Sequence, residues 1–170
     1  SSAASDVYKR QANLYRYFTN KQQIGVACCD RWMADRMDRL RKVLRHPSYT
    51  AGERLEAIIV ENLRFTHELS DNHPAVPEMF EVITTMEPEI VRRKVEAMVG
   101  LFAEVLLHGQ TRGEFEVDDV FASARAVHAS QAVFEVPLFT HLYSREYFEG
   151  MARDMARILV QGLARRGEEQ

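Results

Sequence analysis

Residues 12–24 read Ala-Asn-Leu-Tyr-Arg-Tyr-Phe-Thr-Asn-Lys-Gln-Gln-Ile, and the inference of the fold starts from this stretch. Three aromatic side chains, Tyr15, Tyr17 and Phe18, fall within a single helical turn. The stretch predicts a short helix over residues 13–18 with an unusual aromatic surface.

The polar pair Thr19-Asn20 follows, and both residue types favour helix N-caps over helix interiors. We therefore expect a break at this pair and a long helix from Lys21 to about Arg45. That helix should end before Pro47, because the residue before a proline avoids the helical region.

The order Leu14-Tyr15-x-x-Phe18, a polar pair and then Lys21 resembles the end of the recognition helix and the start of the next helix in the tetracycline-repressor (TetR) family. The resemblance implies an all-α helical bundle. It also implies a ligand-responsive DNA-binding transcriptional regulator, a repressor whose operator binding is relieved by a small-molecule effector in the helical domain.

The same resemblance implies DNA contacts for Asn13, Tyr15, Tyr17 and Lys21. Phenol groups and a lysine at a helix N-terminus suit phosphate oxygens, and such contacts position a protein on DNA without reading its sequence. Asn13 is expected near base edges. The alternative is an aromatic turn that only packs on the long helix.

The resemblance also suggests the domain boundaries. Residues 1–11 are expected to be a non-native tail, since Asp6-Val7-Tyr8-Lys9-Arg10-Gln11 is a possible translation of a transposon end used in sequencing libraries. A natural polar tail is the alternative. Residues 12–24 are then a remnant of the helix-turn-helix, and residues 25–170 a ligand-binding and dimerisation domain. A chain that contains so little of the DNA-binding helix-turn-helix should dimerise without binding operator DNA specifically.

The composition is that of an ordinary globular domain. The 170 residues are 46% apolar and 28% charged, with a net charge of −3, so any DNA contact needs a local basic patch. No apolar run approaches the length of a membrane span, and the adjacent pair Cys28-Cys29 fits a reducing cytoplasm. We expect a cytoplasmic protein that does not contact membranes.

Helical periodicity continues through the rest of the chain. We expect further helices over about 51–69, 76–85, 88–109, 118–142 and 145–166, giving six or seven helices in total. Thr50 and Glu53 have capping-box spacing, and Gly113 should stop the helix that begins at Pro88. Residues 109–115 also resemble the link between the two long late helices of TetR-type regulatory domains.

The predicted helix over 118–142 contains Pro137, which should kink the helix or end it early. It has two distinct faces. One is a ridge of small residues, which we expect to join the last helix in a four-helix homodimer interface. The other, His128, Gln131 and Glu135, is polar and either lines an effector pocket or is simply exposed to solvent. The expected interface residues are Ala122, Ala126, Ala129, Val133, Phe148, Met151, Met155, Ile158 and Leu159.

Further pocket candidates come from the middle helices, where TetR-like proteins enclose their ligand. Such a pocket suits a small lipophilic or aromatic effector. For any single residue, ordinary core packing is the alternative. The candidates are Asn62, Phe65, Thr66, Met79, Phe80, Phe102 and Leu106.

Sequence signals for catalysis or metal binding are weak. The sequence has no Gly-rich phosphate loop, no Gly-x-Ser-x-Gly elbow and no His-Glu-x-x-His motif, and its six histidines are scattered. We therefore expect no enzyme activity, no cofactor and no metal. The alternatives to a regulator are a helical homodimeric interaction module without DNA binding and, less favoured, a ferritin-like helical enzyme.

Overall fold

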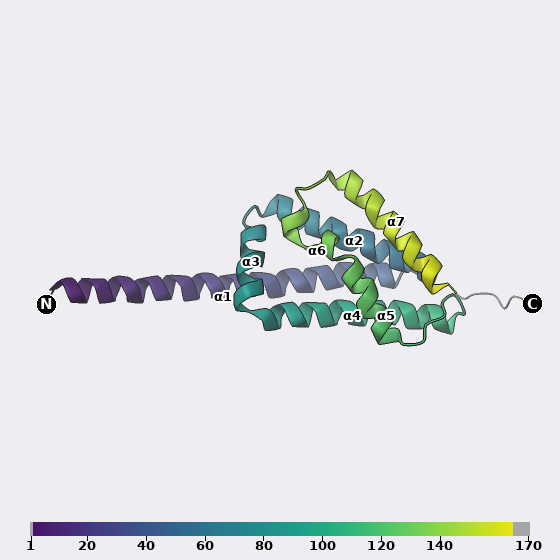
Figure 1. Ribbon diagram of the computed structural model, residues 1–170, viewed down its shortest axis with the longest axis horizontal. Coiled ribbons are helices and arrows are strands. Elements are labelled where there is room, and N and C mark those ends of the chain that lie inside the picture. Colours follow the sequence, from purple (N-terminus) through teal and green to yellow (C-terminus); the bar gives the residue numbers. More distant parts are fainter. Residues whose placement is uncertain (1, 165–170) are drawn as a thin grey trace, which may run out of the picture.

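The computed structural model describes residues 2–164, and for most of residues 2–21 it describes only the backbone. The described chain is an all-α bundle, as predicted, without a β-strand (Figure 1). Its elements are α1 (Ser2–Leu44), α2 (Ala51–Asn72), α3 (Val76–Met86), α4 (Pro88–Thr111), α5 (Val120–Ser130), α6 (Ala132–Glu135), the 3-10 turn η1 (Pro137–Phe139) and α7 (Arg145–Leu163).

Helix α1 differs from the prediction because it is continuous. No break occurs at Thr19-Asn20, and the helix runs through the expected tail as well. Neither residue excludes helix, since each costs only about 0.5–0.7 kcal/mol relative to alanine. The N-terminal half of α1 projects beyond the other helices, whereas its C-terminal half packs against them (Figure 1).

Helix α2 lies at the centre of the bundle and contacts α1, α4 and α7. The predicted capping box is confirmed at its start. The Thr50 hydroxyl accepts a hydrogen bond from the Glu53 N–H at 3.2 Å, and the Glu53 carboxylate accepts one from the Thr50 N–H at 2.8 Å. These bonds satisfy N–H groups that the first turn leaves free, so the helix start is fixed locally.

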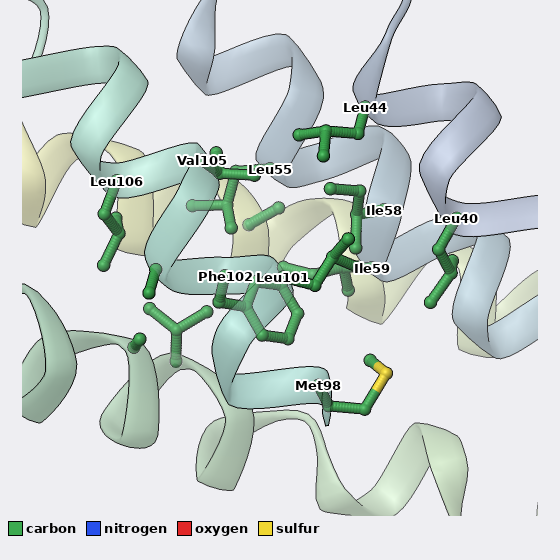
Figure 2. Close-up of a cluster of buried hydrophobic side chains, with 14 of the residues drawn as sticks. Leu40, Leu44, Leu55, Ile58, Ile59, Met98, Leu101, Phe102, Val105 and Leu106 are labelled. Carbon is green, nitrogen blue, oxygen red and sulfur yellow. The ribbon is translucent and has the colours of Figure 1, made fainter. Parts of the chain in front are cut away.

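The core is formed where α1, α2 and α4 meet. Figure 2 shows their apolar side chains pointing toward one another, and most of them have no solvent exposure. Burial of each such side chain contributes about 1.5–3 kcal/mol, so this cluster holds the three helices together. Its labelled members are Leu40, Leu44, Leu55, Ile58, Ile59, Met98, Leu101, Phe102, Val105 and Leu106.

The helix predicted over 118–142 is interrupted earlier than expected, and the early end expected at Pro137 is confirmed, because the last α-helical turn stops at Glu135. Helix α5 starts after Asp119, whose carboxylate accepts a hydrogen bond from the Ala122 N–H at 2.9 Å, but it ends at Ser130. The chain then forms the single turn α6 and the proline-initiated turn η1. This change of direction buries Phe134 and Glu135 against the other helices. Among the described residues, no helix is long and apolar enough to span a bilayer.

Two glycines of α4 test the packing. A Cβ at Gly109 would lie 2.3 Å from Phe115 Cδ2 and 2.8 Å from Ala51 Cβ, whereas a Cβ at exposed Gly100 meets nothing within 4 Å. Gly109→Ala should therefore lower the free energy of unfolding by about 1–3 kcal/mol through overpacking. Gly100→Ala should raise it by about 0.5–1 kcal/mol. Urea denaturation of both variants checks this, and equal effects would contradict the described packing.

Candidate functional site

A cavity of about 560 Å³ lies between α1, α3, α4 and the α6–η1 segment. Much of its wall is apolar, as is typical of sites for small lipophilic molecules. The apolar lining residues include Trp32, Met33, Met37, Val76, Met79, Phe80, Ile83, Ile90, Val91, Val95 and Pro137.

Arg36 of α1 brings a charge to this wall, although its residue is only 5% exposed. Its guanidinium donates hydrogen bonds to Asn62 Oδ1 at 2.9 Å and to Thr66 Oγ1 at 3.3 Å. It also lies over the Phe65 ring, 4.8 Å from the centroid. These three contacts with α2 hold the guanidinium in one orientation, which a buried charge requires.

Glu135 of α6 supplies the carboxylate of the cluster. One of its oxygens, Oε2, lies 3.7 Å from Arg36 and 3.6 Å from Lys94 Nζ, while Oε1 lies 2.8 Å from His128 Nε2. Burial opposes ionisation of Glu135. The close contact with His128 and the charges of Lys94 and Arg36 outweigh the effect of burial and lower the pKa of Glu135 to about 2. The carboxylate is therefore ionised throughout the physiological pH range.

For Lys94 of α4, burial has a larger effect on the pKa than the nearby carboxylate does. Burial, together with the charge of Arg36, lowers its pKa to about 8, against the attraction of Glu135. Its ammonium group lies 5.8 Å from the centroid of Phe80. Lys94 thus stands between the charged cluster and the apolar part of the cavity.

Gln131 adds an unsatisfied group behind this wall. It has no solvent exposure, and its Oε1 meets only a long contact, 3.5 Å from Asn62 Nδ2. Its Nε2 has no hydrogen-bond partner among the described residues. A buried donor without a partner is costly, so the cluster is a polar network with spare hydrogen-bonding capacity.

The structure places four of the ten residues predicted for a pocket in the wall of this cavity. Met79, Phe80, His128 and Glu135 line the cavity. The interpretation of the polar face as solvent-exposed is wrong, because Gln131 and Glu135 are buried.

Other pocket candidates lie elsewhere. Asn62 and Thr66 lie behind the cavity wall and reach it through Arg36. Phe65 lines a separate outer hollow next to Trp32 and His73. Phe102 and Leu106 belong to the core and do not line the cavity, so ordinary packing accounts for both.

The sequence interpretation missed Arg36 and Lys94. The sequence gives little sign of either role, because the basic residues around Arg36 alternate with acidic ones, a pattern typical of a solvated helix face. Helical spacing carries the missed signal: Arg36 lies three residues after Met33 and four before Leu40, both of which face the bundle. Lys94 likewise lies three residues after Val91, which lines the cavity, and four residues before Met98, which lies in the core.

The predicted interface residues divide into three groups. Ala122, Ala126 and Ala129 of α5 are exposed, as are Met151 and Ile158 of α7. Phe148 corrects the prediction: it is fully buried within this chain, in edge contact with Phe134. The remaining three are half-buried against the core: Val133, Met155 and Leu159.

The residues predicted to contact DNA all lie in the projecting half of α1. Asn13 is exposed. The backbone of Tyr15, Tyr17 and Lys21 is helical, and their side chains lie outside the described residues.

Comparisons with known proteins agree with this architecture. A family model described as "Tetracyclin repressor-like, C-terminal domain" matches residues 51–155. A solved structure of a bacterial regulatory protein in the tetR family from Rhodococcus RHA1 is similar, with a TM-score of 0.63 and 15% sequence identity. The match covers 91% of this chain and 80% of that protein. No curated protein matches the sequence significantly. Because the family model spans more than half of the chain, the chain belongs to the TetR family of transcription regulators.

Proposed function

We propose that this chain is the larger part of a ligand-responsive, DNA-binding transcriptional repressor, and that operator binding belongs to the intact protein. Residues 25–170 form its ligand-binding and dimerisation domain, and residues 12–24 belong to its DNA-binding part. The observation that supports the proposal best is that α1 contributes both to the cavity wall and to the buried charge cluster. Arg36 joins α1 to α2 and α6 at the same place where Met33 and Met37 line the cavity.

This arrangement supports a mechanism in which an effector shifts a conformational equilibrium. A ligand changes the orientation of α1 only if it binds one arrangement of the cavity wall more tightly than another. The N-terminal half of α1 projects away from the bundle (Figure 1). A small rotation at Arg36 therefore becomes a larger displacement at residues 12–24, about 20 residues or 30 Å along the helix.

The proposed DNA contacts are Asn13, Tyr15, Tyr17 and Lys21. The phenols and the ammonium group position the protein on phosphates, which contributes affinity but no sequence information. Movement of these residues in a dimer changes the spacing of its two halves, which must match successive major grooves. Effector binding at the cavity then releases the operator.

The proposed dimer forms through α5 and α7. In Figure 1 both helices lie nearer the viewer than α1 and α2. They present exposed apolar side chains, with Phe121 61%, Ile158 66% and Met151 36% exposed. The alanines of α5 allow a partner helix to approach closely, and burial of these side chains against a second copy favours association.

The ligand-binding role is tested by filling the cavity. Met79→Trp should abolish stabilisation by lipophilic compounds that raise the melting temperature of the wild-type chain, because indole occupies the cavity. Val82→Trp is the matched control on α3, since Val82 is 42% exposed and does not line the cavity. A thermal-shift screen checks this. Compounds that stabilise all three proteins equally would show that binding occurs elsewhere.

The regulatory role is tested in the source organism. Deletion of the gene should raise a small set of transcripts, and expression of the wild-type gene should return them to their original level. RNA sequencing checks this, and an unchanged transcript profile would count against a repressor.

The dimer is tested by placing charges on its proposed face. Ile158→Glu and Ala126→Glu should each weaken self-association by at least about tenfold, because each buries a carboxylate against its symmetry mate. Val82→Glu, on α3, should leave it unchanged. Sedimentation velocity across a concentration series measures this, and a wild-type chain that remains monomeric would refute the dimer.

A further inference from the structure

The cavity wall carries more positive than negative charge. Arg36 and Lys94 both approach the same oxygen, Oε2 of Glu135. Among the described residues, Glu135 is the only carboxylate that forms an ion pair with either cation. Asp30, also at the cavity, pairs with Arg93, where both side chains are more than half exposed. Two inward cations therefore share one buried carboxylate.

The distances show that neither cation is fully compensated. Charge-assisted N–H···O bonds are normally about 2.7–2.9 Å long, whereas the two contacts with Glu135 Oε2 are 3.6 and 3.7 Å. The other oxygen of Glu135 is already occupied by His128 at 2.8 Å. The partners of Arg36 on α2, Asn62 and Thr66, orient the guanidinium but bring no negative charge.

The pKa of Lys94 reflects the same arrangement of charges together with burial. Its pKa is lowered to about 8 because burial and repulsion by Arg36 exceed the attraction of Glu135. The remaining ionisable neighbour is Cys29, whose own pKa is raised, chiefly by burial. A second anion next to Lys94 would restore the charged ammonium.

The rest of the cavity is apolar, so the site has two chemically distinct ends. Met79 and Ile83 of α3 and Val91 of α4 line the apolar part. Lys94 connects the two ends, because its stem belongs to the apolar wall and its ammonium group to the cluster.

We infer that the cavity binds an amphipathic anion, a lipophilic carboxylate whose head group pairs with Lys94 and Arg36 and whose apolar body lies among α1, α3 and α4. This inference rests on the proposed effector site and specifies its ligand class. The bound carboxylate competes with Glu135 for Arg36, and so it acts directly on the contact that joins α1 to α6.

Three probes of equal chain length and different charge test this inference: decanoate, decanol and decyltrimethylammonium. Isothermal titration calorimetry should show decanoate binding at least about tenfold more tightly than decanol, and the ammonium compound more weakly still. Equal or tighter binding of decanol or the ammonium compound overturns the anion preference but leaves the cavity as an effector site. Binding of none of the three overturns the inference, and the Met79→Trp screen then decides separately on the site.

Variants of Lys94 assign the preference to this residue. Lys94→Met should weaken decanoate binding by at least about tenfold and bring it close to that of decanol, while Lys94→Arg should keep the preference. Lys42→Met, at an exposed position of α1, is the control and should change nothing. An undiminished preference in Lys94→Met would overturn the assignment.

The pH dependence gives a second readout. Decanoate remains ionised above pH 7, and its binding raises the pKa of Lys94. The affinity should therefore be constant below the free-state pKa of about 8 and should fall as the pH rises through it. Lys94→Met should remove this decline. A decline of equal size in both proteins would point to Cys29 or another group and would contradict the inference.

Discussion

A single carboxylate oxygen, Glu135 Oε2, lies between two inward-facing cations on different helices, and the geometry of the site depends on this contact. Each buried ion costs on the order of several kcal/mol to remove from water, so the arrangement persists only with compensating partners. α1 supplies Arg36, α4 supplies Lys94, and α6 supplies the carboxylate. The cluster therefore adds a charged link among α1, α4 and α6 to the packing of the hydrophobic core.

The cluster also connects the cavity with α1. Apolar packing at Leu40 and Leu44 fixes the C-terminal end of that helix in the core. Arg36 lies one turn nearer the projecting half, beside the cavity. Helix α1 stays in contact with α3 as far as Gly25, so a ligand that changes the environment of Arg36 acts within the packed half of α1. Because the chain belongs to the TetR family, we propose that this geometry serves to switch the protein between operator-bound and free states.

Much of the fold could be predicted from local sequence. The Thr50–Glu53 capping box and the stop at Gly113, which has a positive φ of 72°, depend on short-range backbone chemistry and are confirmed. The break after Ser130 could not be predicted, because no glycine or proline lies next to it in the sequence. The role of Arg36 was missed because its charge indicates solvent, while its partners come from α2 and α6.

The central claim is that a ligand in the cavity reorients α1 relative to the bundle. Its most direct test is the distance between spin labels at exposed Arg16 on α1 and exposed Glu104 on α4. Both are replaced by cysteine, with Cys28 and Cys29 replaced by serine. Double electron–electron resonance on labelled protein diluted with unlabelled protein reports this distance within one chain. We expect the distribution of distances between the two labels to shift at saturation with decanoate, or with any ligand whose binding Met79→Trp abolishes. An unchanged distribution at demonstrated saturation would contradict it.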